Sequence, residues 1–210
     1  MKEKLKVINI IKSVILILCI TLSFYLIFEN VTSKIKKEKE DKIVAKFIEE
    51  NTNENDIEEN TNKTNYNQGY ISDRYNYTSV LEIPKIGLKK GLNSINSKYN
   101  NVKYNIQIII GSDMPNVDNG NFILASHNGG SYKAFFKRLN ELNKDDIVNV
   151  YYQGYKYEYK ISFSYEIAKT GFANIQKNGN KTAITLITCK KNTRDTQIVY
   201  VGYLNSKVKY

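Results

Sequence analysis

The longest hydrophobic run in the chain lies near its N-terminus. Residues 13–28 carry no charge, and residues 7–11 extend the apolar run past Lys12. A membrane-spanning helix needs about 20 mostly apolar residues, and a lysine near its end can reach the interface. We therefore predict a transmembrane anchor over residues 7–28. A cleaved signal peptide is the alternative interpretation, but residues 25–30 offer no small-residue cleavage site.

Charges on either side of this run indicate its orientation. Residues 1–6 are short and basic, whereas Glu and Asp dilute the lysines of residues 34–42. The positive-inside bias puts the tail of residues 1–6 in the cytoplasm and the bulk of the chain outside. The expected location is therefore the cell membrane, with a single span and an extracellular domain.

The segment after the anchor, residues 29–74, changes character along its length. Residues 34–50 fit a charged helix with a narrow apolar stripe formed by Ile43, Val44, Phe47 and Ile48. The stripe is compatible with a coiled-coil seam but is too short to identify one. Over residues 51–64, Ile57 is the only apolar residue, which predicts a solvated stalk. All eleven glycines follow residue 68, so we expect the folded domain over residues 75–210.

Within that domain the hydrophobic pattern is mostly that of strands. Over residues 155–165 aromatic or aliphatic side chains occupy every odd position, which predicts a strand with one face on a core. Further strands are expected over residues 80–83, 104–110, 122–127, 183–189 and 198–204. One helix is predicted after the Asn128-Gly129-Gly130 turn, with Ser131 as its N-cap and an apolar face of Phe135, Phe136, Leu139 and Leu142. The expected fold class is mainly β, a closed antiparallel barrel or a sandwich with one or two short helices.

The formal net charge of +10 adds a question about partners. It suggests nucleic acid, an anionic membrane surface or an acidic wall polymer, unless it only reflects a composition rich in Lys, Asn, Ile and Tyr. Basic residues are not interleaved with stacking aromatics in a recognisable nucleic-acid-binding motif. We therefore expect no nucleic-acid partner.

The two cysteines differ in their surroundings. Cys19 lies inside the predicted anchor and Cys189 lies deep in the C-terminal half, so the two cannot pair if the anchor is in a bilayer. Cys189 is then a free thiol outside the cell, where most cysteines form disulfides. Its presence therefore calls for a chemical explanation.

A thiol-dependent acyl transfer needs a nucleophile, a base and a donor to the oxyanion, and Cys189, His127 and Arg194 could supply them. A cysteine attacks as its thiolate, and its ordinary pKa of about 8.5 must be lowered or served by a base. His127 is the only histidine, and Arg194 is a guanidinium that can stabilise a developing oxyanion. Each also has an ordinary explanation, as a buried small residue, a turn residue and a solvated arginine. One histidine and one usable cysteine are too few for a zinc site, and we expect no metal or cofactor.

The stretch Thr185-Leu186-Ile187-Thr188-Cys189 resembles the TLxTC signature of the sortases, membrane-anchored cysteine transpeptidases of Gram-positive bacteria. The resemblance covers roughly residues 78–205. It includes the opening Leu81-Glu82-Ile83-Pro84, a strand that ends in His127, and the order His, Cys, Arg. It implies an eight-stranded sortase-type barrel.

The resemblance also implies a reaction. Sortases cleave an LPxTG-type motif between Thr and Gly, form a thioester on the cysteine and transfer the acyl group to a cell-wall amine. Cys189 would be the nucleophile, His127 the acid and base, and Arg194 the oxyanion donor. The implied partners are secreted proteins with a C-terminal sorting signal and a cell-wall precursor amine. Substrate contacts are expected from Thr188, Ile187 and Ala168, the last at the start of residues 168–181, where the family recognises its motif.

Two features bear on the kind of sortase. In many members the arginine directly abuts the final strand, whereas here Asp195-Thr196-Gln197 separate Arg194 from the expected strand. The 62-residue step from His127 to Cys189 leaves no room for the long inserted helix of class B. With no C-terminal hydrophobic segment and no lid-like sequence before Pro84, a class A or D type is expected rather than B or C.

Two other functions remain as alternatives. A different wall-acting cysteine hydrolase would need another motif, since an L,D-transpeptidase has His and Gly before its cysteine and a papain-like enzyme has its cysteine before its histidine. A non-enzymatic wall-binding or adhesion module would use the positive charge and would not need Cys189.

Overall fold

A computed structural model describes residues 2–53, 73–131, 133–171, 173 and 175–210. The chain divides into two compact units, one ending at Lys42 and the other running from Ile43 to Tyr210. The predicted stalk over residues 51–64 lies almost entirely outside the described residues. The boundary expected at residue 75 stays a prediction.

The first element, α1 (Lys2–Asn53), is a continuous helix that includes both predicted helical segments. It is long and apolar enough to cross a membrane. Its polar residues are compatible with that setting, because the hydroxyls of Thr21 and Ser23 donate to the carbonyls of Leu18 and Cys19 at 3.0 and 2.8 Å. Such back-bonding leaves no free hydroxyl donor on these two side chains in an apolar surrounding.

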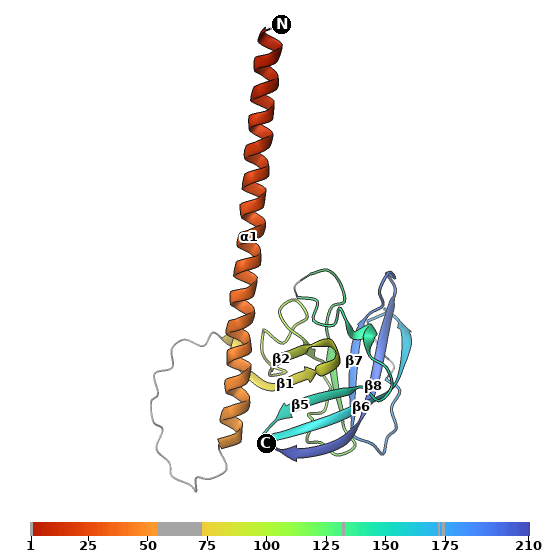
Figure 1. The fold of residues 1–210 in the computed structure, drawn as a ribbon. Coiled ribbons are helices and arrows are strands. Elements are labelled where there is room, and N and C mark those ends of the chain that lie inside the picture. The colour runs from red at the N-terminus through yellow and green to blue at the C-terminus, as the bar shows by residue number, and fades with distance from the viewer. Residues whose placement is uncertain (1, 54–72, 132, 172, 174) are drawn as a thin grey trace. The chain divides into compact units, whose positions relative to one another are not determined.

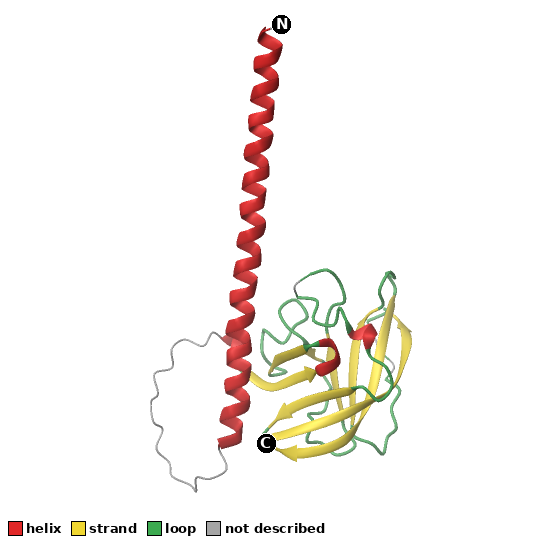
Figure 2. Ribbon diagram, in the orientation of Figure 1, coloured by secondary structure: helices red, strands yellow, loops and turns green. Residues whose placement is uncertain are grey.

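The second unit is built on one eight-stranded sheet (Figures 1 and 2), which confirms the predicted mainly β, eight-stranded barrel. One of its strand pairings is parallel, whereas the hydrophobic pattern alone led us to expect an antiparallel barrel or sandwich. Its strand order is β2-β1-β5-β6-β8-β7-β4-β3. The strands are β1 (Tyr77–Ile83), β2 (Leu88–Asn93), β3 (Gln107–Ile108), β4 (Asn121–Ala125), β5 (Ile147–Tyr152), β6 (Tyr155–Ala168), β7 (Ala183–Cys189) and β8 (Thr196–Lys209). Three short 3-10 helices are η1 (Asp73–Tyr75), η2 (Pro84–Ile86) and η3 (Leu139–Glu141).

The sheet curls until its two edge strands approach one another. The side-chain amide of Asn105, just before β3, donates to the carbonyl of Gly91 at 2.9 Å and to Oδ1 of Asn93 at 2.8 Å, both in β2. Strand β2 is an edge of the sheet, and the bond to the Gly91 carbonyl pairs one of its backbone groups that no neighbouring strand pairs. Asn105 is buried and joins the segment before β3 to β2, so its bonds bring the two edges of the sheet together and make the barrel nearly closed.

A bulge in β6 gives the sheet two apolar faces. Ile161 pairs with Gly202 but Phe163 pairs with Val201, so one residue of β6 is left over. Because neighbouring residues point to opposite faces, this shift turns the rest of β6 over. Before the bulge, Tyr157, Tyr159 and Ile161 fill the barrel interior. After it, β6 joins a second apolar face, made of Ile123, Ala125, Phe163, Tyr165, Ile167, Ile187, Val199 and Val201.

The predicted helix after Ser131 is wrong. Ala134 and Lys137 donate their N–H groups to carbonyls three residues earlier, which forms turns rather than an α-helix. The N–H of Phe136 instead reaches the carbonyl of His127 at 3.2 Å. The apolar residues of this segment still enter the core, and they include Phe136, Leu139 and Leu142. Burial of these residues therefore dictates the path of the chain more strongly than their helical spacing does.

The strand predictions differ from the structure in extent. Of residues 104–110 only Gln107–Ile108 form a strand. The N–H groups of Tyr104 and Asn105 both turn back to the carbonyl of Asn101. Strands β2 and β5 were not predicted. β2 carries Lys89 and Lys90 beside Gly91, which masks its pattern.

The apolar stripe of α1 is covered within the chain. Val44 is 2% exposed and packs with Tyr77 and Val80 of β1. Partly buried side chains surround this cluster, namely Ile43, Phe47, Ile48, Tyr75 and Tyr151. The end of the helix thus belongs to the same compact unit as the sheet.

We expect Val44→Ala to destabilise this unit by about 1–3 kcal/mol, because it removes buried methyl groups and leaves a cavity. Thermal unfolding of the full chain in detergent measures the effect. Val31→Ala is the matched control, since Val31 lies on the same helix and is 49% exposed. Equal unfolding temperatures for the two variants would show that the stripe adds no stability.

Candidate active site

The candidate site lies where two parallel strands end. β4 and β7 run parallel, with Ala125 opposite Ile187. The pairing continues past β4, because the N–H of Ser126 donates to the carbonyl of Ile187 at 3.2 Å. His127 therefore comes just after the end of β4, and Cys189 is the last residue of the adjoining strand β7, although the two are 62 positions apart in sequence.

Strand alternation decides on which side of the sheet Cys189 lies. His127 is two positions after Ala125, and Cys189 is two positions after Ile187. Ala125 and Ile187 both belong to the second apolar face. Because side chains two apart on a strand share a face, the thiol lies at the end of that face. Cys189 is half-buried and His127 is exposed, so a substrate can reach both.

Arg194 lies in the hairpin loop that follows the cysteine. β8 begins at Thr196 rather than at the predicted residue 198, and Cys189 pairs with Gln197. The N–H of Lys190 closes the loop on the carbonyl of Thr196 at 2.9 Å. Arg194 is thus two residues before the final strand, which is closer than the predicted start at residue 198 implied. Arg194 is exposed.

Two contacts join this loop to the end of β6. The ammonium of Lys190 is 2.6 Å from Oε1 of Glu166, and the N–H of Lys169 donates to the carbonyl of Asp195 at 2.8 Å. The backbone of the Arg194 loop is therefore tied to the segment that starts at Ala168. An ion pair this exposed adds little stability of its own, so the backbone bond is the firmer of the two.

The predicted substrate-contact residues occupy three different environments. Thr188 is buried, and its hydroxyl donates to the carbonyl of Ser126 at 2.8 Å, which joins the ends of β4 and β7. Ile187 is 7% exposed on the second apolar face. Ala168 is exposed at the end of β6, opposite Thr196. Their roles in binding stay predictions.

Asn128 is a site residue that the sequence analysis missed. Its side-chain amide donates to the carbonyl of Cys189 at 3.0 Å. In the sequence Asn128 stands before two glycines and therefore resembles an ordinary turn residue. Nothing in that pattern indicates a contact with a residue 61 positions later.

Tyrosine hydroxyls hold the loop between β6 and β7. The N–H of Gln176 donates to the hydroxyl of Tyr165 at 2.7 Å, and the N–H of Asn178 donates to that of Tyr203 at 2.9 Å. The ammonium of Lys177, between them, donates to the carbonyl of Asn119. Ile175 packs on the second apolar face beside these bonds. The described part of the loop is thus attached to the face that ends at Cys189.

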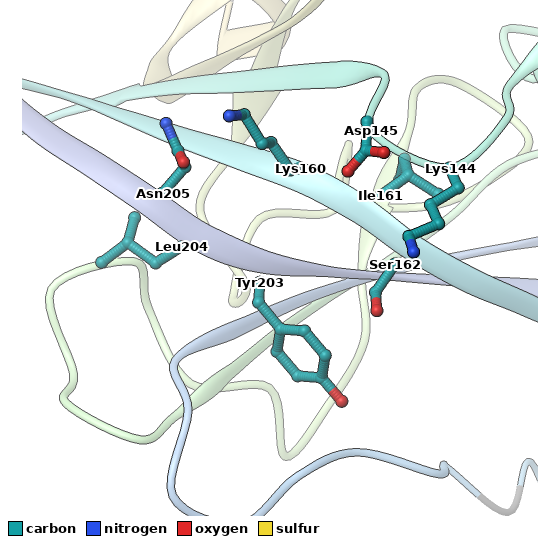
Figure 3. Close-up of a pocket in the computed structure, with 8 residues that line it drawn as sticks. All are labelled: Lys144, Asp145, Lys160, Ile161, Ser162, Tyr203, Leu204 and Asn205. Carbon is teal, nitrogen blue, oxygen red and sulfur yellow. The ribbon is translucent and has the colours of Figure 1, made fainter.

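A shallow hollow of about 190 Å³ lies elsewhere (Figure 3). Lys144, Asp145 and Lys160 line it, together with Tyr203. Tyr203 pairs with Ala183 at the start of β7, whereas Cys189 ends that strand. The hollow is therefore separate from the candidate site. Among the described residues, no group of three His, Cys, Asp or Glu side chains could hold a metal ion.

We expect Tyr165→Phe to speed hydrogen exchange at the Gln176 amide about 2- to 10-fold, because one hydrogen bond contributes about 0.5–1.5 kcal/mol. Tyr203→Phe should act in the same way on Asn178. Exchange followed by NMR or mass spectrometry measures both effects. Tyr155→Phe, at the far end of β6, is the control and should leave both amides unchanged. Unaltered exchange in all three variants would contradict the attachment of the loop.

Known proteins resemble this chain in sequence and in fold. Residues 81–205, more than half of the chain, match the model of the Sortase domain. No curated protein sequence matches the chain. Among solved structures, sortase A of Listeria monocytogenes is 23% identical, with a TM-score of 0.54 over 64% of this chain and 91% of that one.

Two further structures are similar. Sortase C-3 of Streptococcus pneumoniae is 17% identical, with a TM-score of 0.57 over 63% of this chain and 64% of that one. Sortase C1 of Streptococcus agalactiae is 22% identical, with a TM-score of 0.56 over 62% of this chain and 68% of that one. At these identities the likeness concerns the fold alone.

Proposed function

Because the chain belongs to the sortase family, we propose that it is a membrane-anchored cysteine transpeptidase that joins secreted proteins to a cell-wall amine. One observation carries the proposal. His127, the only histidine, comes just after the end of β4, and Cys189 is the last residue of β7, the parallel neighbour of β4.

The first half of the reaction is an acylation. The thiolate of Cys189 attacks the carbonyl carbon of the Thr–Gly bond in an LPxTG-type motif and forms a tetrahedral intermediate. As the C–N bond breaks, the imidazolium of His127 gives its proton to the leaving amine of Gly. The products are a thioester between Cys189 and the Thr carbonyl, and a released peptide with a new N-terminus.

The second half transfers the acyl group. Neutral His127 takes a proton from the incoming wall-precursor amine, whose nitrogen attacks the thioester carbon. A new amide forms and the thiolate of Cys189 leaves, so the enzyme returns to its starting state. Arg194 donates hydrogen bonds to the oxygen that carries negative charge in both tetrahedral intermediates. Its place in the loop closed by Lys190 and Thr196 supports this role.

The remaining residues serve binding and location. The second apolar face leads along β7 to Cys189, and a motif lying on it would contact Ile187 and the loop that begins after Ala168. Thr188 would act indirectly, because its hydroxyl fixes the carbonyl of Ser126 beside His127. Residues 7–28 would hold the enzyme in the cell membrane with the catalytic domain outside.

The test uses the full chain in detergent with labelled LPxTG, NPxTN and LAxTG peptides and an amine acceptor. We expect cleavage between Thr and the next residue of at least one peptide, transfer to the acceptor, and a Cys189 thioester that hydroxylamine releases. Cys189→Ala should abolish all three. Absence of cleavage and of thioester with every peptide would falsify the transpeptidase proposal. Salt-sensitive wall binding that survives Cys189→Ala would then favour the adhesion alternative.

The role of Arg194 has its own prediction. Arg194→Ala should lower kcat about 100- to 1,000-fold, the usual effect of losing an oxyanion donor, and Arg194→Lys should restore only part of it. Lys191→Ala, an exposed residue in the same loop, is the control. Steady-state kinetics with the cleaved peptide measure both. Normal turnover in Arg194→Ala would remove this residue from the mechanism and leave the roles of Cys189 and His127 intact.

A further inference from the structure

The contact between Asn128 and Cys189 occupies a particular position in the sheet. In the parallel pairing of β4 with β7, the N–H of Ser126 donates to the carbonyl of Ile187. Partners advance by two residues on each strand of a parallel ladder, so the next bond in this direction joins residue 128 to residue 189. At that position the side-chain amide of Asn128 donates to the carbonyl of Cys189 at 3.0 Å.

Asn128 thus extends the ladder beyond the end of β4 with its side chain. The carbonyl of Cys189 obtains a donor at the last position of β7, where the neighbouring strand has already ended. Without this donor the carbonyl would lose a hydrogen bond, and Cys189 would move more freely. Cys189 is the proposed nucleophile.

His127 lies between the two bonds. Ser126 is fixed to Ile187 on one side of it, and Asn128 is fixed to Cys189 on the other. The carbonyl of His127 is held as well, because the N–H of Phe136 donates to it at 3.2 Å. The backbone that carries the imidazole is therefore attached directly to the backbone that carries the thiol.

We propose that Asn128 is a positioning residue, whose side-chain amide holds His127 in register with Cys189. The proposal rests on the proposed function of the His127–Cys189 pair. It adds that the alignment of this pair depends on one side-chain hydrogen bond and not only on the strands. Asn128 itself does not touch the reacting atoms. Misalignment of reacting groups by about 1 Å can cost about 100-fold in rate, so the loss of this bond should appear in turnover.

The first test does not depend on turnover. The full chain with Cys19→Ala keeps Cys189 as its one thiol, and the rate of its alkylation by iodoacetamide at pH 7 reports the reactivity of that thiol. His127→Ala defines the effect of losing the partner. We expect Asn128→Ala and Asn128→Leu each to change the logarithm of the alkylation rate by at least half as much as His127→Ala does. Leu has nearly the shape of Asn but no N–H donor, so a space-filling role would leave Asn128→Leu at the wild-type rate.

A matched variant separates alignment from general stability. Asn100 also donates its side-chain amide to a strand carbonyl, that of Ile108 at 2.9 Å, but it lies in the segment before β3. Asn100→Ala should lower the unfolding temperature at least as much as Asn128→Ala and leave the alkylation of Cys189 unchanged. With a cleavable peptide, Asn128→Ala should lower kcat about 10- to 100-fold and change KM less than about twofold.

The outcomes distinguish the two proposals. A wild-type alkylation rate in both Asn128 variants, beside a changed rate in His127→Ala, would overturn the role of Asn128 alone. Altered alkylation in the Asn128 variants of a chain that cleaves no peptide would support the role of Asn128 and remove the transpeptidase. If His127→Ala also leaves the thiol unchanged, His127 does not act on Cys189 and the role of Asn128 fails, whereas the peptide assay still decides the transpeptidase.

Discussion

Parallel pairing of β4 with β7 is the constraint on which the candidate site depends. Antiparallel neighbours would bring the end of one strand to the start of the other, whereas parallel neighbours end together. The ends of β4 and β7 therefore lie at one edge of the sheet, with His127 just after β4 and Cys189 as the last residue of β7. The hydroxyl of Thr188 and the amide of Asn128 add side-chain bonds at that edge, where regular backbone pairing stops.

The bulge in β6 determines what surrounds this edge. Without the extra residue, Phe163 and Tyr165 would continue the interior face of Tyr157 and Tyr159. With it, their rings turn to the opposite side and extend the apolar face on which Cys189 lies. The hydroxyl of Tyr165 then receives the backbone of the loop between β6 and β7. One inserted residue thus links the packing of the barrel to the surroundings of the thiol.

Local pattern predicted much of this architecture, and its failures have physical causes. The alternation over residues 155–165 correctly indicated a strand. It could not reveal the bulge, because a bulge changes which face of the sheet the later side chains point to and leaves the alternation in the sequence unchanged. The helical spacing after Ser131 indicated apolar residues that are indeed buried, although turns rather than a helix deliver them. The stripe on α1 was recognised, but its partners on β1 come only after residue 76 and belong to another element.

For the site, the sequence by itself determined which groups are available. A single histidine, a cysteine that ends an apolar run and an arginine shortly after it are the groups on which the proposed chemistry rests, because reactivity belongs to residue types. Only the tertiary structure decided that the strands before His127 and Cys189 are parallel neighbours, that β8 begins close enough to Arg194 to shorten its loop, and that Asn128 reaches the carbonyl of Cys189. These are contacts between distant segments, and no local pattern of polar and apolar residues encodes the direction in which two such strands pair.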